Sequence, residues 1–565
     1  MYSPGVQNIQ IYRANRKPSA FFGGQPGYTY QHHIDIGCWK GRLYAVWDMS
    51  PKDEDTLPCR LVYSTSDDGL NWSEPKDLYP PGKGWNMRFY FYHASNGRML
   101  VFAAGPTDKE KMREIEKTTL LVREITADHS LGDIYTLINP GPKYPPSFEQ
   151  CQDAGFVAAC REAYNNKPLL EQQDYGVLLG DRKMKWHEGT NWPSGKVSGG
   201  TSFWIFGKAL CFYHRQDGTL VGLCKLGYTT LSTDEGQNWS FPVIPKGIEA
   251  GGGKVWGQRT PDGRYAMIYP PQSPGPRFPM AVTTSDDGIS FRDMRVIHGE
   301  VPLQRYEGHC KDMGPQYLRG VAEWGGDAST IDKSAIWVIY SVNKDDIWVS
   351  RIPVPIVAET KEPVRDTFDN VPTGPRVPGW NIYSPTWAPV HIAKATDSAN
   401  QFLELTDSEP VDYGRAIRTF PVSSAGEISF RLAANQNDHG RLEIDLLSEQ
   451  NARPVRIVLN EQGRLLAANG QSLVEVGDYP AGKWAKFTLK FGGEKFSLLR
   501  DGKPILKGAA FAEAASKVYA ISFRTGEFRG TVSELATVDL LNTEEMAVTS
   551  GYRIDDVMTS HLRVK

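Results

Sequence analysis

Short apolar runs separated by Gly, Pro, Asn and Asp fill the first 355 residues, and long helical patterns are nearly absent there. Several of these runs directly follow a tight turn that contains glycine, namely Arg42–Asp48, Arg98–Ala103, Ala209–His214 and Arg264–Tyr269. A strand, a glycine turn and a second strand are typical of a β-hairpin. Because the hairpins recur along the chain, the pattern predicts repeated antiparallel sheets.

A second pattern, Ser/Thr-x-Asp-x-Gly-x-x-aromatic, occurs three times, at residues 65–72, 232–239 and 284–291. Asp can hydrogen-bond to its own backbone and Gly tolerates a positive φ, so the pattern predicts a turn that the aromatic residue fixes to a sheet. The motif resembles the Asp-box of the sialidase superfamily. That resemblance implies a β-propeller in which the aspartates of the motif are structural rather than catalytic.

The spacing of the repeats indicates the size of one propeller blade. The copies that start at 232 and 284 lie 52 residues apart, and those that start at 65 and 232 lie 167 apart, close to three such steps. A four-stranded blade takes about 50 residues. We therefore predict an all-β chain with a catalytic propeller over residues 1–356, of six blades with seven possible. The predicted blade starts are near residues 31, 86, 150, 198, 252 and 306.

The character of the chain changes after the propeller. Residues 357–365 are polar and charged and are typical of a linker. From Asp366 onward apolar and polar residues alternate cleanly, as in 426–432 and 441–447, which predicts strands with one buried face. This part resembles concanavalin-like, laminin-G-like β-sandwich (jelly-roll) modules over residues 366–545, with a C-terminal tail at 546–565. Such modules bind glycans, pack on a catalytic domain, or do neither.

Composition excludes several classes of protein. The formal net charge of −3 favours neither nucleic acid nor an anionic membrane as a partner. No apolar run approaches the roughly 18 residues that span a bilayer. The first residues do not resemble a signal peptide. We therefore expect a cytoplasmic protein, or a secreted or periplasmic one if a leader has been removed. The seven cysteines argue against a full disulfide framework, although Cys151 and Cys160 are close enough in sequence to pair.

The sialidase resemblance indicates where chemistry would lie. In that family the Asp-box turns lie opposite the active site, so the site forms from the starts of first strands and the loops after second strands. At such places the sequence offers several cationic residues, which would suit an anionic ligand such as a sialic acid, a uronate or a sulfated sugar. The catalytic candidates are His32, His33, Asp48, His214, Tyr306, Glu307 and His309, and the substrate-binding candidates are Arg88, Arg215, Lys254, Trp256, Arg277 and Lys311.

Several candidates also have a purely structural interpretation. Neighbouring residues of a strand face opposite sides, so one of His32 and His33 would point into the mouth of the propeller while the other packs in the sheet. His214 and His309 can serve as structural hydrogen-bond partners, and Trp256 suits packing. The His-His-x-Asp sequence at His32 matches no strong metal signature, so we predict no metal and no cofactor, with structural calcium as an alternative.

Sialidases use three arginines for the substrate carboxylate, a Tyr–Glu nucleophile and an Asp acid. The resemblance therefore assigns Arg88 and Arg277 to two of those arginines, Asp48 to the acid and Tyr306 to the nucleophile. The family's Arg-Ile-Pro motif lies near the N-terminus. Here the motif lies at 351–353, at the far end of the propeller, so its arginine does not correspond to the arginine of the family's motif.

A second resemblance points to elimination chemistry. Gln31-His32-His33 followed by residues 41–47 resembles propeller enzymes that act on rhamnose–glucuronate linkages, including ulvan-type lyases. In such enzymes an Arg or His neutralises the uronate, a His or Tyr removes the C5 proton, and a Tyr or His protonates the leaving oxygen. The corresponding set here would be His32, His33, His214, Tyr306 and Arg215.

Three functions therefore remain open. The first is an exo-acting glycoside hydrolase on an acidic glycan, which needs a carboxylate pair, with Asp48 and Glu307 as candidates, or a Tyr–Glu pair. The second is a polysaccharide lyase with a His/Tyr/Arg site, and the third is a non-catalytic glycan-binding propeller. All three imply a glycan partner, and none implies nucleic acid or a membrane. Fold alone does not choose among them, and the sequence does not indicate an oligomeric state.

Overall fold

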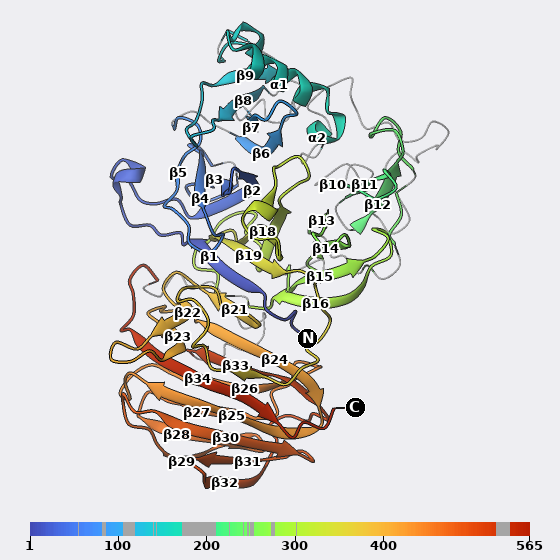
Figure 1. Cartoon of the computed structure of the whole chain (residues 1–565). Helices are drawn as coiled ribbons and strands as arrows, with labels where there is room; N and C mark the ends of the chain where they lie inside the picture. The colour runs from blue at the N-terminus through green and yellow to red at the C-terminus, as the bar shows by residue number, and fades with distance from the viewer. Residues whose placement is uncertain are drawn as a thin grey trace. The chain divides into compact units, whose positions relative to one another are not determined.

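The computed structural model consists almost entirely of strands (Figure 1). It divides into a propeller unit of residues 11–294 and 306–355 and a sandwich unit of residues 1–10, 295–305 and 356–565. Among the described residues, no helix has both the length and the apolar character needed to cross a bilayer. The structure describes residues 1–54, 56–81, 86–104, 119–138, 141–142, 144–171, 211–224, 227–240, 242–245, 248, 253–272, 277–300, 302–526 and 543–564.

Four small antiparallel sheets form the blades of the propeller unit. Each chain segment returns on itself through a tight turn, as the glycine hairpins predict. The sheets are β2 (Tyr30–Trp39), β3 (Arg42–Ser50), β4 (Arg60–Ser66) and β5 (Lys76–Asp77); β6 (Asn86–His93), β7 (Met99–Ala104), β8 (Leu120–Ile125) and β9 (Tyr135–Ile138); β10 (Cys211–His214), β11 (Leu220–Leu223) and β12 (Thr229–Ser232); and β13 (Trp256–Arg259), β14 (Tyr265–Tyr269), β15 (Met280–Ser285) and β16 (Arg292–His298).

The first strand of each sheet lies on the inside of the ring. Strand β2 lies beside β6 and β17 (Pro315–Gly320), and β13 lies beside β10 and β17. Strand β17 pairs with β18 (Ala335–Val342), which pairs with β19 (Asp346–Pro353). The predicted all-β propeller is therefore confirmed, with four blades that are separate sheets among the described residues and with β17, β18 and β19 in the place of the predicted last blade. The count of six stays a prediction, because the expected blade start near 198 lies outside the described residues.

Helices stand where the third blade was predicted to start. The segment near residue 150 contains η3 (Phe148–Gln150), α1 (Ala154–Asn165) and α2 (Lys167–Glu171). The carboxylate of Asp153 caps α1 by accepting hydrogen bonds from the first backbone N–H groups. The buried residues of α1 recur at helical spacing, which explains why this segment forms helices instead of the strand predicted to start the third blade. Cys151 and Cys160, which we considered as a pair, are both free.

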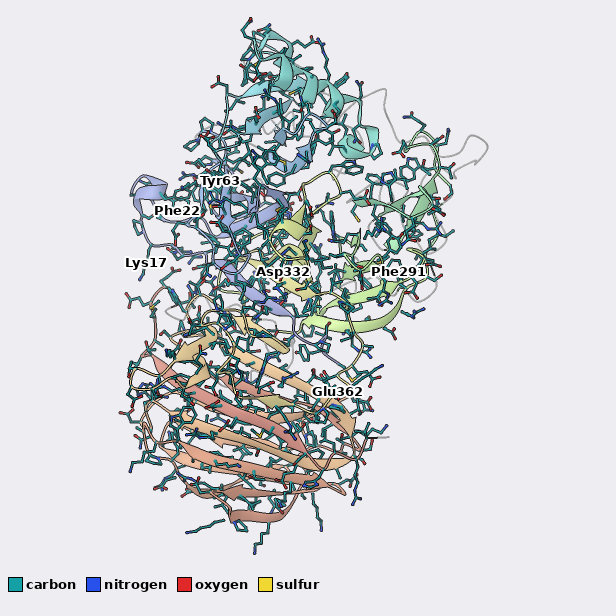
Figure 2. All side chains as sticks on the ribbon, in the orientation of Figure 1. Lys17, Phe22, Tyr63, Phe291, Asp332 and Glu362 are labelled. Carbon is teal, nitrogen blue, oxygen red and sulfur yellow. The ribbon has the colours of Figure 1, made fainter. Side chains whose placement is uncertain are left out.

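The three sequence repeats adopt one hydrogen-bonded turn that follows the third strand of a blade. In the first repeat Ser66 Oγ accepts from the Gly69 N–H at 2.8 Å, and Asp68 Oδ1 accepts from the Asn71 N–H at 2.8 Å. Asp234 and Asp287 make the equivalent bond in the other two turns. Phe291, labelled in Figure 2, is the aromatic residue of the third repeat and is buried. These aspartates therefore serve the turns.

The sandwich unit consists of two facing sheets around one apolar core. Sequence alternation accounts for this, because every second residue of a strand points inward. One sheet contains β1 (Gln7–Tyr12), β21 (Trp380–Ser384), β24 (Arg415–Ser423), β33 (Val518–Thr525), β26 (Leu442–Ser448), β27 (Arg456–Leu459), β28 (Arg464–Asn469) and β29 (Ser472–Asp478). The other contains β22 (Val390–Lys394), β23 (Gln401–Asp407), β34 (Ser550–Ser560), β25 (Ala425–Ala434), β30 (Ala485–Gly492), β31 (Lys495–Arg500) and β32 (Lys503–Ala510), with β20 (Arg365–Asp366) paired to β34.

The ends of the chain differ from the predicted domain boundaries. Residues 1–10, which we placed in the propeller, group with the sandwich unit, where Gln7–Ile9 pair in parallel with Ile382–Ser384. The predicted C-terminal tail contains β34, which pairs with both β23 and β25 inside a sheet. Its alternating sequence, with Tyr552 and Ile554 buried, is that of a strand.

Asp407, at the end of β23, gives a pH-dependent prediction. Burial raises its pKa to about 7, assisted by the charge of Glu409. An Asp in the unfolded chain has a pKa of about 3.9, so the folded state binds the extra proton between these values and loses stability as the pH rises. We expect Asp407→Asn to gain stability over the wild type from about pH 4 to 7, by at most about 1.4 kcal/mol per pH unit, and to hold a constant advantage above. Urea unfolding at several pH values measures this, and a pH-independent difference would contradict it.

Candidate functional site

Two inner strands are distorted at the same end of the propeller. In β2 the register with β3 shifts between His32 and Asp35, and His33 has a φ of 37°. In β17 the register with β18 shifts between Gln316 and Arg319, and Tyr317 has a φ of 56°. Bulges of this kind re-aim side chains and are common beside active sites. A positive φ at His or Tyr is costly and is typical of functional positions.

The bulges bring three aromatic rings together. The ring centroids of His32 and Tyr317 lie 3.9 Å apart, and those of His32 and His33 lie 3.8 Å apart. The centroid of His33 lies 5.5 Å from that of Tyr317. Simple strand alternation predicted that only one histidine would face the mouth. Because the bulge breaks the alternation, both histidines belong to one cluster with Tyr317.

Three cations, two of them buried, lie around the ring of Tyr317. Lys254 Nζ lies 4.1 Å from its centroid, Lys344 Nζ lies 5.4 Å away, and the guanidinium carbon of Arg277 also lies 5.4 Å away. The lysines are 7% and 2% exposed, and the Arg277 side chain is 15% exposed. Burial lowers the pKa of Lys344, which shows that its charge is poorly solvated. Arg277 also pairs with Asp312 at 3.2 Å, so Lys254 and Lys344 are the cations of this group that would favour an anionic ligand.

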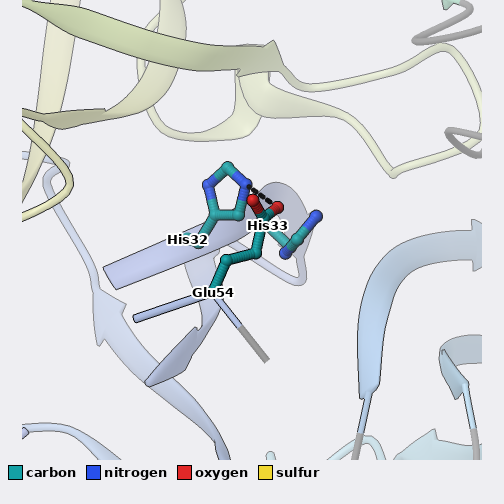
Figure 3. A group of neighbouring side chains, drawn as sticks. All are labelled: His32, His33 and Glu54. Carbon is teal, nitrogen blue, oxygen red and sulfur yellow. Dashed lines mark ion pairs between the residues drawn. The ribbon is translucent and has the colours of Figure 1, made fainter. Parts of the chain in front are cut away.

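Each histidine of the cluster has its own carboxylate. His33 Nδ1 lies 3.3 Å from Asp48 Oδ1, and His32 Nε2 lies 3.3 Å from Glu54 Oε1, as the dashed line in Figure 3 marks. Burial alone would raise the pKa of Glu54, but His32, His33 and Lys344 together hold it well below its usual range. Burial, with His33 and Lys344 nearby, lowers the pKa of His32.

The same group offers ligand atoms for a metal. Those of His32, His33 and Glu54 all lie within 4.8 Å of one another (Figure 3). Two histidines and a carboxylate are a ligand set that zinc uses in enzymes. However, Lys344 lowers the pKa of His32 through its charge, and Lys254 and Arg277 adjoin the same tyrosine, so a further cation would be repelled. The charges fit an anionic group better than a metal ion.

His214 and Arg215 lie at the opposite end of the blades. The sequence suggested that they follow a second strand, but β10 is the first strand of its sheet, so they stand at its far end. His214 Nδ1 lies 2.7 Å from Glu323, and its Nε2 lies 3.2 Å from Glu235 in the second repeat turn. Arg215 Nε donates to the backbone oxygen of Asp287 in the third repeat turn at 2.7 Å. Neither residue joins the cluster.

The candidates expected in the last blade serve other purposes. Tyr306 is buried, and its hydroxyl donates to the Ala14 carbonyl at 3.1 Å. Lys311 Nζ is buried in an ion pair with Asp345 at 2.5 Å and donates to the Thr29 carbonyl at 2.7 Å. Glu307 and His309 are exposed. These residues precede β17, and the inner strand of this blade starts at Pro315 instead of near 306.

Trp256 and Arg88 are the last two of the predicted substrate-binding residues. Trp256 is fully buried, and its indole N–H donates to Gln258 at 2.8 Å, so it serves packing rather than sugar stacking. Arg88 belongs to strand β6, but its side chain lies outside the described residues. Of the candidates, the cluster therefore contains His32, His33, Asp48, Lys254 and Arg277.

Sequence reasoning missed Tyr317, Lys344 and Glu54. Glu54 and Lys344 lie in loops that follow second strands, where the site was expected, since Glu54 follows β3 and Lys344 follows β18. Neither loop carries a motif that would have singled them out. Tyr317 was missed because the start of its blade was placed near Tyr306. The run Pro315–Gly320 before the apolar strand Ala335–Val342 was the available signal.

Both units of this chain are similar to known families, and the whole chain is similar to a solved structure. Residues 1–175 match a family model described as an N-terminal beta propeller, and residues 380–537 match one described as the sialidase-like CBM domain. A solved structure named Sialidase is 31% identical, and the match covers 99% of this chain and 52% of that chain with a TM-score of 0.86. The chain thus spans about half the length of that relative. No curated protein matches the sequence.

Two other matching structures have lower identity and a lower TM-score. The Trypanosoma rangeli sialidase in complex with 2,3-difluorosialic acid is 11% identical over 100% of this chain and 97% of that chain, with a TM-score of 0.37. A protein of unknown function from Dyadobacter fermentans DSM 18053 is 16% identical over 62% of this chain and 99% of that chain, with a TM-score of 0.36. Likeness at that level does not establish a common fold, so neither of these two structures carries an argument about this chain. The chain therefore combines a sialidase-like β-propeller with a sialidase-like carbohydrate-binding domain.

Proposed function

We propose that the propeller is an exo-acting glycoside hydrolase that removes an acidic sugar from a glycan. The observation that carries this proposal is the group of three cations around the ring of Tyr317, namely the buried Lys254 and Lys344 and the partly buried Arg277. A sugar carboxylate bound among these cations would place its anomeric carbon beside the tyrosine. The sialidase-like fold supports the same class of reaction by analogy.

Tyr317 is the proposed nucleophile in place of Tyr306. Neighbouring cations stabilise a phenolate, which makes the tyrosine oxygen more reactive. The oxygen would attack the anomeric carbon and form a bond to it while the glycosidic bond breaks. The neighbouring cations would offset the negative charges of both the phenolate and the acidic sugar, so that the two can approach each other.

His33, held by Asp48 at 3.3 Å, is the proposed proton donor. Its proton would pass to the oxygen of the leaving sugar as the glycosidic bond breaks. The resulting neutral imidazole would then take a proton from water, which attacks the anomeric carbon and releases Tyr317. His32 and the carboxylate of Glu54 would orient the substrate and the tyrosine ring from the other side.

Incubation with glycans that end in sialate, uronate or sulfated sugars tests this function. We expect release of a free acidic sugar and new reducing ends, without the ultraviolet absorbance of an unsaturated uronate. Neutral glycans should not be cleaved. No release from any member of a broad acidic panel would contradict the hydrolase and would favour a propeller that only binds glycans.

A lyase is the second candidate function, and the contact of His32 with Tyr317 favours it. In that reaction the cations would neutralise the uronate, a histidine would remove the C5 proton, and the tyrosine would protonate the leaving oxygen. Elimination creates a double bond in the product. A rise in ultraviolet absorbance during cleavage would therefore identify the lyase and exclude the hydrolase.

Lys254→Met tests the anionic subsite separately from the chemistry. Loss of one buried charge-assisted contact should raise KM about 10- to 100-fold and weaken inhibition by the free acidic sugar to the same degree. The matched control is Lys40→Met, because Lys40 is exposed in the turn after β2. Equal KM values for the two variants would remove Lys254 from substrate binding.

A further inference from the structure

A pocket of about 670 Å³ opens on the second sheet of the sandwich unit. It lies over β23, β25 and β34 and is bordered by the loop that joins β22 to β23. Its volume falls within the range of small-molecule sites. Residues that line it include Asn400, Phe402, Glu404, Arg431, Trp484 and Arg553.

Strand alternation places this pocket on the outer face of the sheet. Leu403 and Leu405 of β23 belong to the apolar core between the two sheets. Phe402 and Glu404 alternate with them and therefore point the other way. Arg431 and Arg553 likewise alternate with core residues of β25 and β34. The pocket is thus separate from the core and is built on rigid strands.

Trp484 supplies an aromatic wall. The guanidinium carbon of Arg431 lies 4.9 Å from the centroid of the indole, and the ring of Phe402 meets it edge-on with centroids 5.8 Å apart. The two neighbours fix the indole, which remains partly exposed and lines the pocket. A fixed aromatic side chain of this kind offers apolar surface to the C–H face of a sugar ring at little cost in conformational entropy.

Polar groups stand around the indole at distances longer than hydrogen bonds. Arg553 Nε lies 3.6 Å from Glu404 Oε1, and Arg431 Nη1 lies 3.8 Å from Asp555. Arg553 Nε is buried and makes no hydrogen bond among the described residues. Sugar hydroxyls both donate and accept, so they can satisfy a carboxylate and a guanidinium side by side.

The charges of the pocket nearly cancel. Its lining contains the cations Lys394, Arg431 and Arg553 and the anions Asp397 and Glu404. Asp555 lies beside Arg431 and offsets it further. A balanced lining gives no net attraction for an acidic glycan. We propose that this pocket binds neutral sugar units of a glycan chain, with Trp484 as the stacking surface and Glu404 and Arg553 as hydroxyl ligands. This proposal does not rest on the hydrolase proposed for the propeller.

Affinity gel electrophoresis of the full chain tests the proposal, with galactan, arabinan, xylan or mannan as neutral probes and polygalacturonate as the acidic probe. We expect at least one neutral polysaccharide to retard the wild type, with little effect of salt. Trp484→Ala should abolish the retardation, and the isosteric Glu404→Gln should weaken it about 10-fold or more. Arg464→Ala, an exposed arginine on the other sheet, is the matched control for Arg553→Ala and should behave as the wild type.

Every other outcome overturns the assignment. Retardation by polygalacturonate alone would show that the ligand is acidic. Retardation that survives in Glu404→Gln and Trp484→Ala but is lost in Lys254→Met would place the binding in the propeller. Glu404→Gln keeps the shape of the side chain, so it tests the pocket even if Trp484→Ala does not fold. Thermal unfolding of each variant shows whether that variant is folded.

Discussion

Tyr317→Phe is expected to lower kcat about 1,000-fold or more on an acidic substrate, with only a small change in KM. The variant keeps the ring that contacts His32 and the three cations, but it lacks the oxygen that forms the bond to the sugar. Removal of a nucleophile costs transition-state stabilisation without removing substrate contacts, so the loss belongs in kcat. Release of the free acidic sugar under saturating substrate measures it.

Tyr306→Phe is the matched control. This residue is also a buried tyrosine in the same unit, but its hydroxyl donates to the Ala14 carbonyl and is outside the cluster. The substitution should cost about 1 kcal/mol in stability and leave kcat unchanged. A Tyr306→Phe variant without activity beside an active Tyr317→Phe would return the nucleophile to the position that the sequence first suggested.

The histidines allow a parallel comparison. His33→Ala removes the proposed proton donor and should reduce kcat about 100-fold or more, whereas His309→Ala, at an exposed position outside the cluster, should not. The pair distinguishes residues that sequence reasoning treated alike. Identical activity of both variants would show that neither histidine takes part.

The turn repeats show what the sequence could predict and where it was one residue off. Their pattern correctly predicted tight turns, and the structure places these turns after third strands. The pattern's third position is Asp67 in the first repeat and Asp286 in the third, yet the carboxylates that bond the turns are Asp68 and Asp287. Asp67 and Asp286 instead pair with Arg42 at 2.6 Å and Arg264 at 2.8 Å. In the second repeat the pattern's third position, Asp234, is itself the carboxylate that bonds the turn. The reason is one extra residue before the glycine, Glu235, which has a φ of 53°.

The candidate site was less accessible to sequence reasoning for a physical reason. Hydrophobic alternation reports which strands exist, but it assumes regular geometry. The bulges at His33 and Tyr317 break that geometry, and no residue type in the sequence predicts them. Lys254 and Arg277 were found because cations near a predicted mouth are informative. Glu54 and Lys344 come from loops whose sequences carry no motif, so only the fold reveals them.

Glu443→Ala is expected to destabilise the sandwich unit by about 3–5 kcal/mol. The Glu443 side chain is 1% exposed and lies 2.5 Å from Arg524 and 3.1 Å from Arg441. Arg453 and Arg456 each lie 3.5 Å from it. The charges of Arg524, Arg441 and Arg456 lower the pKa of Glu443 against the opposing effect of burial. Removal of this carboxylate leaves four arginines crowded together, with Asp445 as the remaining nearby anion.

The control is Glu427→Ala. Its partner Lys490 lies 3.1 Å away in a partly exposed pair, so the substitution should change stability by less than about 1 kcal/mol. Calorimetric unfolding of both variants gives the comparison, and equal shifts would contradict a buried charge centre. The pH dependence provides a second check, because a carboxylate with a lowered pKa contributes its stability above the unfolded value of about 4.3. The advantage of the wild type over Glu443→Gln should therefore persist at neutral pH and disappear only as the pH falls through the lowered pKa of Glu443. A difference that instead grew on acidification would mean that the arginines do not depend on this charge.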